Sequence, residues 1–174
     1  MFAQRFVVAC SIVALWTPAH IVAQVESAPV VQHRNVISGN PFLLLAEWFN
    51  GEYERMITPE STVGLRAARL SLGGDSFDDV YSSARAFYRY YPTAAFQRFY
   101  VGLDAGITSF KSETVKDQTL FAAGFELGYN WLLGTRQKLY LSLGVGADRL
   151  FVSELGDAAV VIPTVRVLNI GLAF

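Results

Sequence analysis

The sequence predicts an all-β fold, an eight-stranded antiparallel up-and-down barrel that spans a membrane. Three observations support this prediction. From Val63 onward, apolar residues alternate with small or polar ones, which is the period of a strand with two different faces. The second face is rich in glycine and poor in long polar residues. No stretch after Gln24 reaches about 18 residues without a charge, so no transmembrane helix is expected.

Residues 1–23 have the pattern of a cleavable signal peptide. Arg5 supplies a positive charge, residues 6–16 are almost all apolar, and small residues precede a cleavage point after Ala23. This apolar run is too short for a membrane-spanning helix, which needs about 20 residues. A lipoprotein signal at Cys10 is the alternative, although little apolar sequence precedes that cysteine. We expect residues 24–174 to form one exported domain.

The composition excludes several classes of function. Of the 174 residues, 52% are hydrophobic and 17% charged, which is too apolar for a disordered chain. The 14 Lys+Arg and 15 Asp+Glu nearly balance, so no nucleic-acid partner is expected. The one cysteine, Cys10, and His20 lie in the leader, which leaves His33 as the only imidazole of the mature chain. We therefore expect no disulfide, no thiolate or His-rich metal site and no cofactor.

Each strand is assigned from its alternation. In residues 119–133, Phe125 and Leu127 share one face, whereas Gly124 and Glu126 share the other. The same rule holds for residues 83–91, 99–110, 138–152 and 164–174, and two further strands flank a turn at residues 58–61. These are seven strands. An even number is needed to bring both chain ends to the periplasmic side, so one more strand must precede Ile57.

Two positions compete for this first strand. In one, residues 30–37 form the strand and residues 38–41 turn into a long strand 42–57. In the other, which we prefer, residues 36–45 form the strand and the chain reverses near Glu47, where the apolar phase switches. Asn50-Gly51 could form a type I′ hairpin turn there. A bulge in one long strand would explain the phase switch equally well.

The two faces of the strands decide the environment. Glycine weakens a strand that faces water, whereas the narrow interior of eight strands needs small residues to admit a few large ones. We therefore expect the apolar face to point to lipid and the interior to be filled by side chains and closed. A paired ion network is predicted inside, formed by Glu52, Glu54, Arg66, Arg85, Arg89, Asp104, Glu126 and Asp148. A soluble barrel with the apolar face turned inward is the alternative.

The links between the strands alternate in length. Residues 58–61 and 134–137 are short links, residues 73–82, 111–118 and 153–163 are long, and residues 92–98 are ambiguous. Short periplasmic turns and longer external loops are typical of outer-membrane barrels. Aromatic residues cluster near the strand ends, as in interfacial girdles. Four arginines have the phase of the lipid face but lie toward strand ends, where they cost least: Arg55, Arg69, Arg149 and Arg166.

The end of the chain carries a family resemblance. Leu168, Ile170, Leu172 and the terminal Phe174 resemble the closing-strand signature of bacterial outer-membrane proteins. Residues 24–174 as a whole resemble the small barrel superfamily typified by the OmpA transmembrane domain. Residues 40–55 look like the opening of an exported barrel family of unknown function. The resemblance implies the fold, an outer-membrane location and recognition of the terminal strand by the barrel assembly machinery, and it implies no activity. We expect no cell-wall-binding domain after Phe174, so the resemblance does not imply cell-wall tethering.

Catalytic and metal-binding interpretations are weaker than structural ones. A lipid-modifying enzyme needs a base beside a serine, and no histidine follows His33. Glu52 and Glu54 could form an acid pair, but the arginines are simpler partners. The glycines of residues 102–106 and 144–146 lack the lysine of a phosphate loop. Asp75, Asp78 and Asp79 lack a full calcium ligand set and fit a solvated loop better.

The sequence therefore predicts a small bacterial outer-membrane barrel with a structural or interaction role. Its expected partners are membrane lipids and the assembly machinery, and its oligomeric state is left open. We predict no catalytic residues. The alternatives are an outer-membrane lipid-modifying enzyme and a soluble periplasmic carrier of an apolar ligand.

Overall fold

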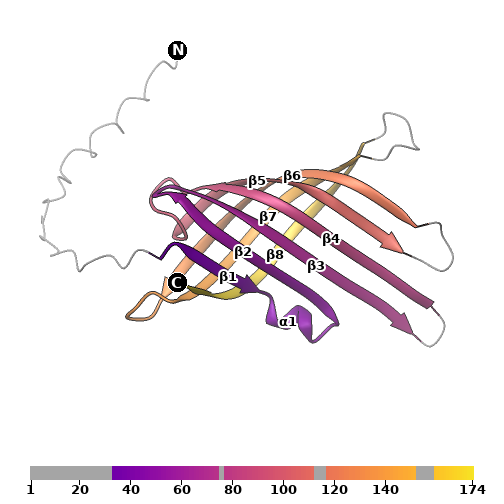
Figure 1. The fold of residues 1–174 in the computed structure, drawn as a ribbon, viewed down its shortest axis with the longest axis horizontal. Helices are drawn as coiled ribbons and strands as arrows, with labels where there is room; N and C mark the ends of the chain where they lie inside the picture. Colours follow the sequence, from indigo (N-terminus) through magenta and orange to yellow (C-terminus); the bar gives the residue numbers. More distant parts are fainter. Residues whose placement is uncertain (1–32, 75–76, 112–116, 152–158) are drawn as a thin grey trace, which may run out of the picture. The chain divides into compact units, whose positions relative to one another are not determined.

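The computed structural model describes residues 33–74, 77–111, 117–151 and 159–174 (Figure 1). In it the chain forms a closed barrel of eight antiparallel strands, each hydrogen-bonded to its neighbours in chain order, with the last strand paired to the first. This confirms the predicted fold class. The expected signal peptide, residues 1–23, lies outside the described residues.

The first strand is the shortest of the eight and the sixth is the longest. They are β1 (Asn35–Gly39), β2 (Trp48–Thr58), β3 (Ser61–Gly74), β4 (Phe77–Tyr90), β5 (Arg98–Lys111), β6 (Gln118–Leu133), β7 (Leu139–Phe151) and β8 (Ala159–Ala173), and a short helix α1 (Pro41–Leu44) follows β1. In the described part of the chain, no helix is both long and apolar enough to cross a bilayer. The C-terminus and the links 59–60, 91–97 and 134–138 lie at one end of the barrel, called here the terminal end (Figure 1). The opposite end, which carries α1, is called the loop end.

The strands turn their apolar side chains outward. Exposed fractions reach 65% at Leu65, 63% at Leu103 and 68% at Val165, although all three lie within strands. The alternate positions are buried or partly buried, and most of them hold charged, polar or small residues. A water-soluble barrel would show the reverse arrangement. The structure thus gives the barrel an apolar outer surface and a polar interior.

Glycines on the inner face leave room for large side chains. A Cβ atom added at Gly144 would lie 2.9 Å from the Tyr100 hydroxyl, and one added at Gly102 would lie 3.2 Å from Cγ of Arg89. Gly128 also faces the ring of Tyr100. The small residues that distinguish the inner face in the sequence therefore make space for these two fully buried side chains.

The first strand is much shorter than expected. The predicted strand over residues 36–45 is wrong beyond Gly39, because Asn40 caps a helix through its side chain, which accepts hydrogen bonds from the amides of Phe42 and Leu43, and Pro41 occupies the first turn. The chain does reverse at Glu47, where φ is positive at 57°. The hairpin turn considered at Asn50-Gly51 is also wrong, since both residues lie inside β2.

The link predicted over residues 73–82 is also shorter than expected. β3 continues to Gly74 and β4 already begins at Phe77, so Asp78 and Asp79 lie in a strand rather than in a loop. The sequence predicts a loop at Asp78 and Asp79 because acidic residues are typical of solvated links. Strands that extend past the apolar band carry the same polarity, which explains the error.

A bulge in β8 reverses the predicted orientation of Arg166. Between Ser142 and Gly144 of β7, the pairing moves from Asn169 to Arg166, so β8 carries one additional residue there. Leu168 has a positive φ of 23° within this bulge. A bulge changes which face the following side chains occupy. The expectation that Arg166 faces lipid is therefore wrong, because its side chain is only 7% exposed and points into the barrel.

Candidate functional site

The largest group of charged side chains lies at mid-height in the barrel interior. Three arginines meet three glutamates in what is called here the central ion cluster: Arg66, Arg89 and Arg166 with Glu52, Glu54 and Glu126. These residues come from five strands, β2, β3, β4, β6 and β8. Their formal charges balance, which offsets the cost of taking each charge out of water.

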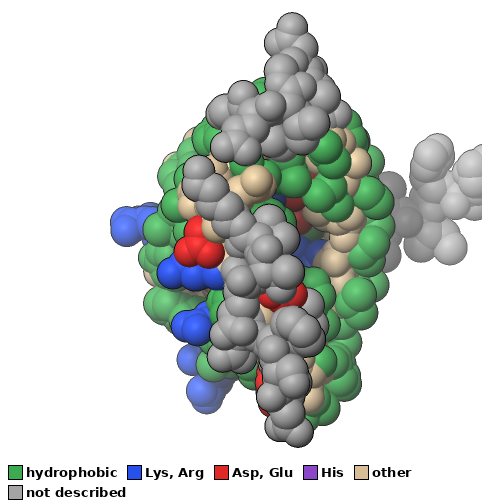
Figure 2. Space-filling view, turned by 90° about the vertical axis from the view of Figure 1, so that its right-hand side faces the viewer, with side chains coloured by type: hydrophobic (Ala, Val, Ile, Leu, Met, Phe, Trp, Pro, Cys, Tyr) green, Lys and Arg blue, Asp and Glu red, His purple; other side chains and the backbone are tan. Residues whose placement is uncertain are grey.

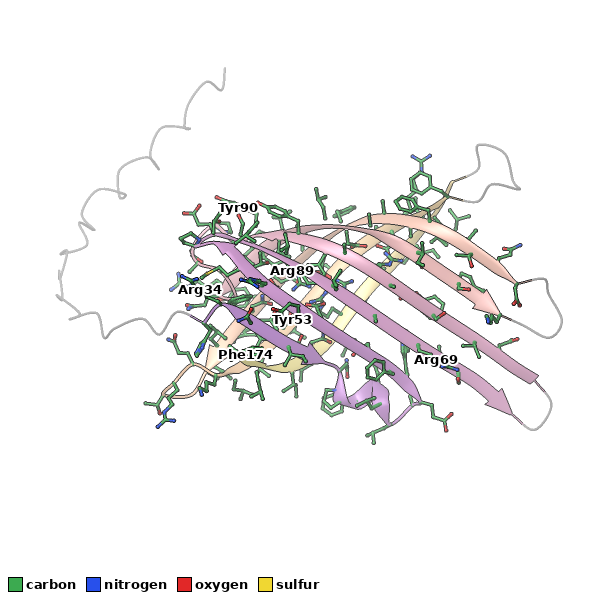
Figure 3. The ribbon with its side chains drawn as sticks, in the orientation of Figure 1. Arg34, Tyr53, Arg69, Arg89, Tyr90 and Phe174 are labelled. Carbon is green, nitrogen blue, oxygen red and sulfur yellow. The ribbon has the colours of Figure 1, made fainter. Side chains whose placement is uncertain are left out.

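Arg89 is the centre of the central ion cluster. Its guanidinium donates to Glu52 at 2.7 Å and to Glu126 at 3.1 Å, and it also pairs with Glu54. It lies 4.2 Å from the ring centre of Phe87 and 4.8 Å from that of Tyr100, which places aromatic faces against the cation. The Arg89 side chain is completely buried. Figure 3 shows Arg89 inside the barrel and Arg69 nearer the loop end.

A second, smaller group of ions lies toward the loop end. Arg85 of β4 donates to Asp104 at 2.9 Å and to Asp148 at 2.5 Å, and more weakly to the Thr108 hydroxyl at 3.4 Å. With one arginine and two aspartates, this group carries one excess negative formal charge. It adjoins a space that side chains do not fill.

Hydrogen bonds connect the central ion cluster to the terminal end. The Thr62 hydroxyl donates to Glu54 Oε1 at 2.5 Å and the Tyr91 hydroxyl to the same oxygen at 2.7 Å. The Asn130 amide donates to the Tyr91 hydroxyl at 2.9 Å. Burial, reinforced by the Glu54 carboxylate, raises the pKa of the Tyr91 hydroxyl well above its usual range. Tyr91 therefore remains a neutral hydrogen-bond donor to Glu54.

Apolar side chains close the terminal end, and they are called here the aromatic plug. The plug consists of Val36, Tyr91, Ala95, Phe96, Tyr100, Tyr140 and Ala173, all buried. Three of them come from the link 91–97, which turns inward and donates backbone hydrogen bonds to Pro59 and Glu60 of the neighbouring turn. The ring of Tyr91 contacts those of Phe96 and Tyr100, with centroids 6.3 and 5.6 Å away. Sequence reasoning identified residues 92–98 only as a link of ambiguous length.

The loop half of the interior is hollow. It holds a cavity of about 660 Å³ whose floor includes Glu52, Arg66, Arg85 and Asp148. The cavity walls are mostly apolar and include Leu70, Val80, Phe110, Ile162 and Val165. Figure 2, which views the barrel from the loop end, shows some acidic and basic side chains among hydrophobic ones beside the grey atoms. The expectation of a side-chain-filled interior is therefore wrong for this half of the barrel.

The eight residues predicted for the ion network all lie on the inner face. The structure brings Glu52, Glu54, Arg66, Arg89 and Glu126 into the central ion cluster, and Arg85, Asp104 and Asp148 into the second group. Sequence reasoning missed Arg166, which bridges Glu52 at 2.9 Å and Glu126 at 2.7 Å. The signal that could have found it is Val167-Leu168, two adjacent apolar residues between two alternating runs.

Candidate metal ligands and the single described histidine were the remaining groups of interest in the sequence. No group of three or more His, Cys, Asp or Glu side chains among them is placed to hold a metal ion. His33 is buried at the terminal end, where its Nε2 lies 2.9 Å from the carbonyl of Arg136. It therefore lies at the opposite end of the barrel from the cavity.

The proposed assembly signal lies in β8, which pairs with β1 to close the barrel. This junction of the first and last strands is called here the seam. Leu168 and Ile170 are partly exposed, whereas Leu172 and Phe174 are 59% and 57% exposed, all on the outer face. The backbone of Phe174 exchanges hydrogen bonds with Asn35, at 2.9 Å in each direction. Figure 3 places Phe174 at the terminal end together with Arg34 and Tyr90.

Comparisons with known proteins identify the family of the chain. No curated protein matches the chain. Among solved structures, the chain is similar to the N-terminal β-barrel domain of OprF from Pseudomonas aeruginosa, with 14% identity over 82% of this chain and 98% of that one and a TM-score of 0.49. The family model described as "Protein of unknown function (DUF3575)" matches residues 19–154, which is more than half of the chain. The chain therefore belongs to the DUF3575 family of proteins of unknown function.

Proposed function

We propose that this protein is a small barrel of the bacterial outer membrane, exported through the signal peptide of residues 1–23, with a structural or interaction role and no catalytic activity. The observation that carries the proposal is the direction of the side chains, with apolar residues exposed on the outside of the barrel and the paired charges of β2 to β8 turned inward. A surface of this extent in water would be a strong aggregation liability. In a bilayer it is the surface that the hydrocarbon requires.

The arrangement of the interior supports the proposal that the barrel is not a general pore. The central ion cluster and the aromatic plug lie one after the other between the cavity and the terminal end. Eight strands leave an interior only wide enough for side chains, and here buried ion pairs and rings occupy the terminal half. Solutes that entered from the loop end would stop at the floor of the cavity.

The arrangement of the acids argues against an enzyme. Glu52 and Glu54, the nearest candidates for an acid pair, both bind Arg89. His33, the histidine that a serine nucleophile would need as its base, instead bonds to a backbone carbonyl at the terminal end. The proposal therefore assigns the inner charges to the stability of the barrel.

Membrane fractionation tests the proposal. We expect the protein to remain in the outer-membrane fraction after a carbonate wash, to require detergent for extraction, and to migrate faster on a gel when unheated than when boiled. Recovery in the soluble periplasm would contradict the proposal and favour the carrier alternative. A change in lipid A mass on overexpression that vanished with His33→Ala would instead establish the lipid-modifying enzyme.

Phe174 provides a separate test of assembly. We expect deletion of Phe174 to reduce the heat-modifiable, membrane-inserted fraction strongly, because the proposed signal ends on this residue. Phe174→Ala is the informative companion, since it keeps the backbone hydrogen bonds to Asn35 and removes only the ring. If the ring is recognised, both variants assemble poorly. Normal assembly of Phe174→Ala would show that only the backbone of the seam matters and would contradict the assembly signal.

A further inference from the structure

The wall of the barrel is incomplete in its loop half. β1 pairs with β8 only from Val36 to Gly39, opposite residues 173–170, and with β2 only from Asn35 to Ser38. Beyond Gly39, the chain turns into α1 (Figure 1). In the part of the chain that the structure describes, residues 159–169 of β8 and residues 48–51 of β2 thus have a strand partner on one side only. The two strands face each other across an opening.

Asn40 marks the base of this opening. Its side-chain amide donates to the carbonyl of Val167 at 2.5 Å, in the β8 bulge, and its backbone amide donates to Oδ1 of Asn50 in β2 at 2.6 Å. Asn40 is only 2% exposed. Asn40 therefore joins the two edges at the base of the opening, and the ion pair between Arg166 of β8 and Glu52 of β2 links the same two strands inside the barrel.

The cavity passes through this opening. Its lining includes Arg66 and Asp148, which point into the barrel, and also Val165 and Val167, which are 68% and 57% exposed on the outer side of β8. Leu43 of α1 completes the lining. Residues of both alternating phases of β8 thus line the cavity, which places it beside the free edge of this strand.

The height of the opening places it in the outer leaflet. Strands rise about 3.3 Å per residue and tilt by about 40°, so Val165 and Val167 lie roughly 20 Å from the level of Phe174. The apolar band of an outer-membrane barrel is about 25 Å tall. With the chain ends on the periplasmic side, the opening lies where the acyl chains of the outer leaflet meet their headgroups.

We propose that the cavity binds one acyl chain of an outer-leaflet lipid, which enters sideways between β2 and β8 and leaves its ester or amide linkage in the opening. This inference rests on the proposed outer-membrane location. A cavity of about 660 Å³ has the size of a small-molecule site, and sites of this kind combine apolar walls with a few polar groups. The apolar walls suit the chain of the lipid.

The polar linkage suits the edges of the opening. Unpaired backbone groups of a strand edge are costly when they face hydrocarbon, and an ester or amide supplies hydrogen-bonding partners for them. The indole Nε1 of Trp48, which is buried beside the cavity, has no hydrogen-bond partner among the described residues. It offers a further donor to a carbonyl of the ligand. Outside the wall, the exposed Arg69 of β3 pairs in register with Phe49 of β2 and is placed to meet a lipid phosphate.

Tryptophan fluorescence can test this binding directly. The chain has three tryptophans, Trp16, Trp48 and Trp131. The full chain with Trp16→Phe and Trp131→Phe leaves Trp48 as the reporter of the cavity, and the full chain with Trp16→Phe and Trp48→Phe leaves Trp131 as the reporter of the outer surface. Both are reconstituted in phosphatidylcholine bilayers with brominated or ordinary acyl chains. We expect bromine to remove most of the fluorescence of each reporter.

A matched pair of substitutions separates the cavity from the outer surface. Ala68→Phe fills the cavity, whereas Ala67→Phe adds the same ring to the outer face of the same strand. We expect Ala68→Phe to restore most of the Trp48 fluorescence and Ala67→Phe to leave the quenching unchanged. Gel migration checks that each variant folds, and Ser83→Leu, at the cavity-lining position of β4 that pairs with Ala68, replaces Ala68→Phe if that variant does not.

Each remaining outcome has a distinct meaning. Quenching of Trp131 but not of Trp48, with Trp48 accessible to aqueous acrylamide, would mean a water-filled cavity and would overturn this inference while leaving the membrane location intact. Quenching of Trp48 by a brominated free fatty acid but not by brominated phospholipid would also overturn it. Shielding of Trp48 from every quencher in a dimeric particle would assign the opening to a second copy of the chain. Failure to quench Trp131 would contradict the proposed membrane location itself.

Discussion

Replacing Arg89 with leucine is expected to destabilise the barrel by about 3–5 kcal/mol, the usual cost of removing one partner from a buried ion pair. The substitution leaves Glu52, Glu54 and Glu126 close together without their shared cation. It also removes the cation from between the rings of Phe87 and Tyr100. The loss of free energy of unfolding can be measured by urea titration in detergent micelles.

Arg69→Leu is the matched control for this substitution. Arg69 is exposed on the outer face of β3, near the loop end, where an outward arginine costs only about 0–1 kcal/mol, so its replacement should change stability little. In the double variant Glu54→Gln with Arg89→Leu, part of the lost stability should return, because one of the unpaired charges is also removed. If Arg89→Leu were no more destabilising than Arg69→Leu, the central ion cluster would not hold the barrel together.

Tyr91→Ala is expected to cost about 3–5 kcal/mol and to raise the ion conductance of the barrel. Tyr91 is completely buried, contacts two other rings of the aromatic plug and donates a hydrogen bond to Glu54. Its truncation opens a space at the terminal end and leaves the Glu54 carboxylate without this donor. The current through planar bilayers should therefore rise above that of the unmodified protein.

Tyr91→Phe separates the two contributions of this side chain. It keeps the ring and removes only the hydroxyl, so we expect a smaller loss of about 1–3 kcal/mol and no rise in conductance. Equal conductance of Tyr91→Ala and the unmodified protein would place the barrier to ions in the central ion cluster rather than in the aromatic plug.

The fold class could be predicted from the sequence because strand alternation is a local property. In residues 119–133, large and small side chains alternate without interruption, and the structure forms β6 over Gln118–Leu133. The inner position of charged residues such as Arg85 and Glu126 follows from the same period, since phase within a strand fixes the face.

The sequence-based predictions were wrong where the alternation of apolar and polar residues is interrupted. At β1, the apolar residues 42–45 continue the composition of a strand, but the side chain of Asn40 satisfies two amides that start a helix. At β8, one additional residue in the bulge moves Arg166 from the expected outer face to the inner one. Both outcomes depend on partners distant in the sequence, such as Val167 for Asn40 and Glu52 for Arg166. Alternation alone carries no information about them.

The filling of the interior could also be predicted only in part. The rule that eight strands enclose only side chains holds for a wall of full height. Here β1 contributes five residues, whereas β8 contributes 15, so the wall is low on one side and the space behind it is not closed. The aromatic plug was also missed, because its link 91–97 has the composition of an ordinary surface loop apart from Tyr91 and Phe96.

The two ladders of β1, with β8 and with β2, have four residue pairs each and are the shortest of the cylinder, whereas β7 and β8 pair along almost their whole lengths. Cooperative units of a protein open in order of their local free energy, and a short ladder contributes least. Amide protons of Ile37 and Leu172 should therefore exchange with deuterium earlier than those of Gly124 and Gly146. The cylinder is therefore expected to open first between its first and last strands, before the remaining six lose their register.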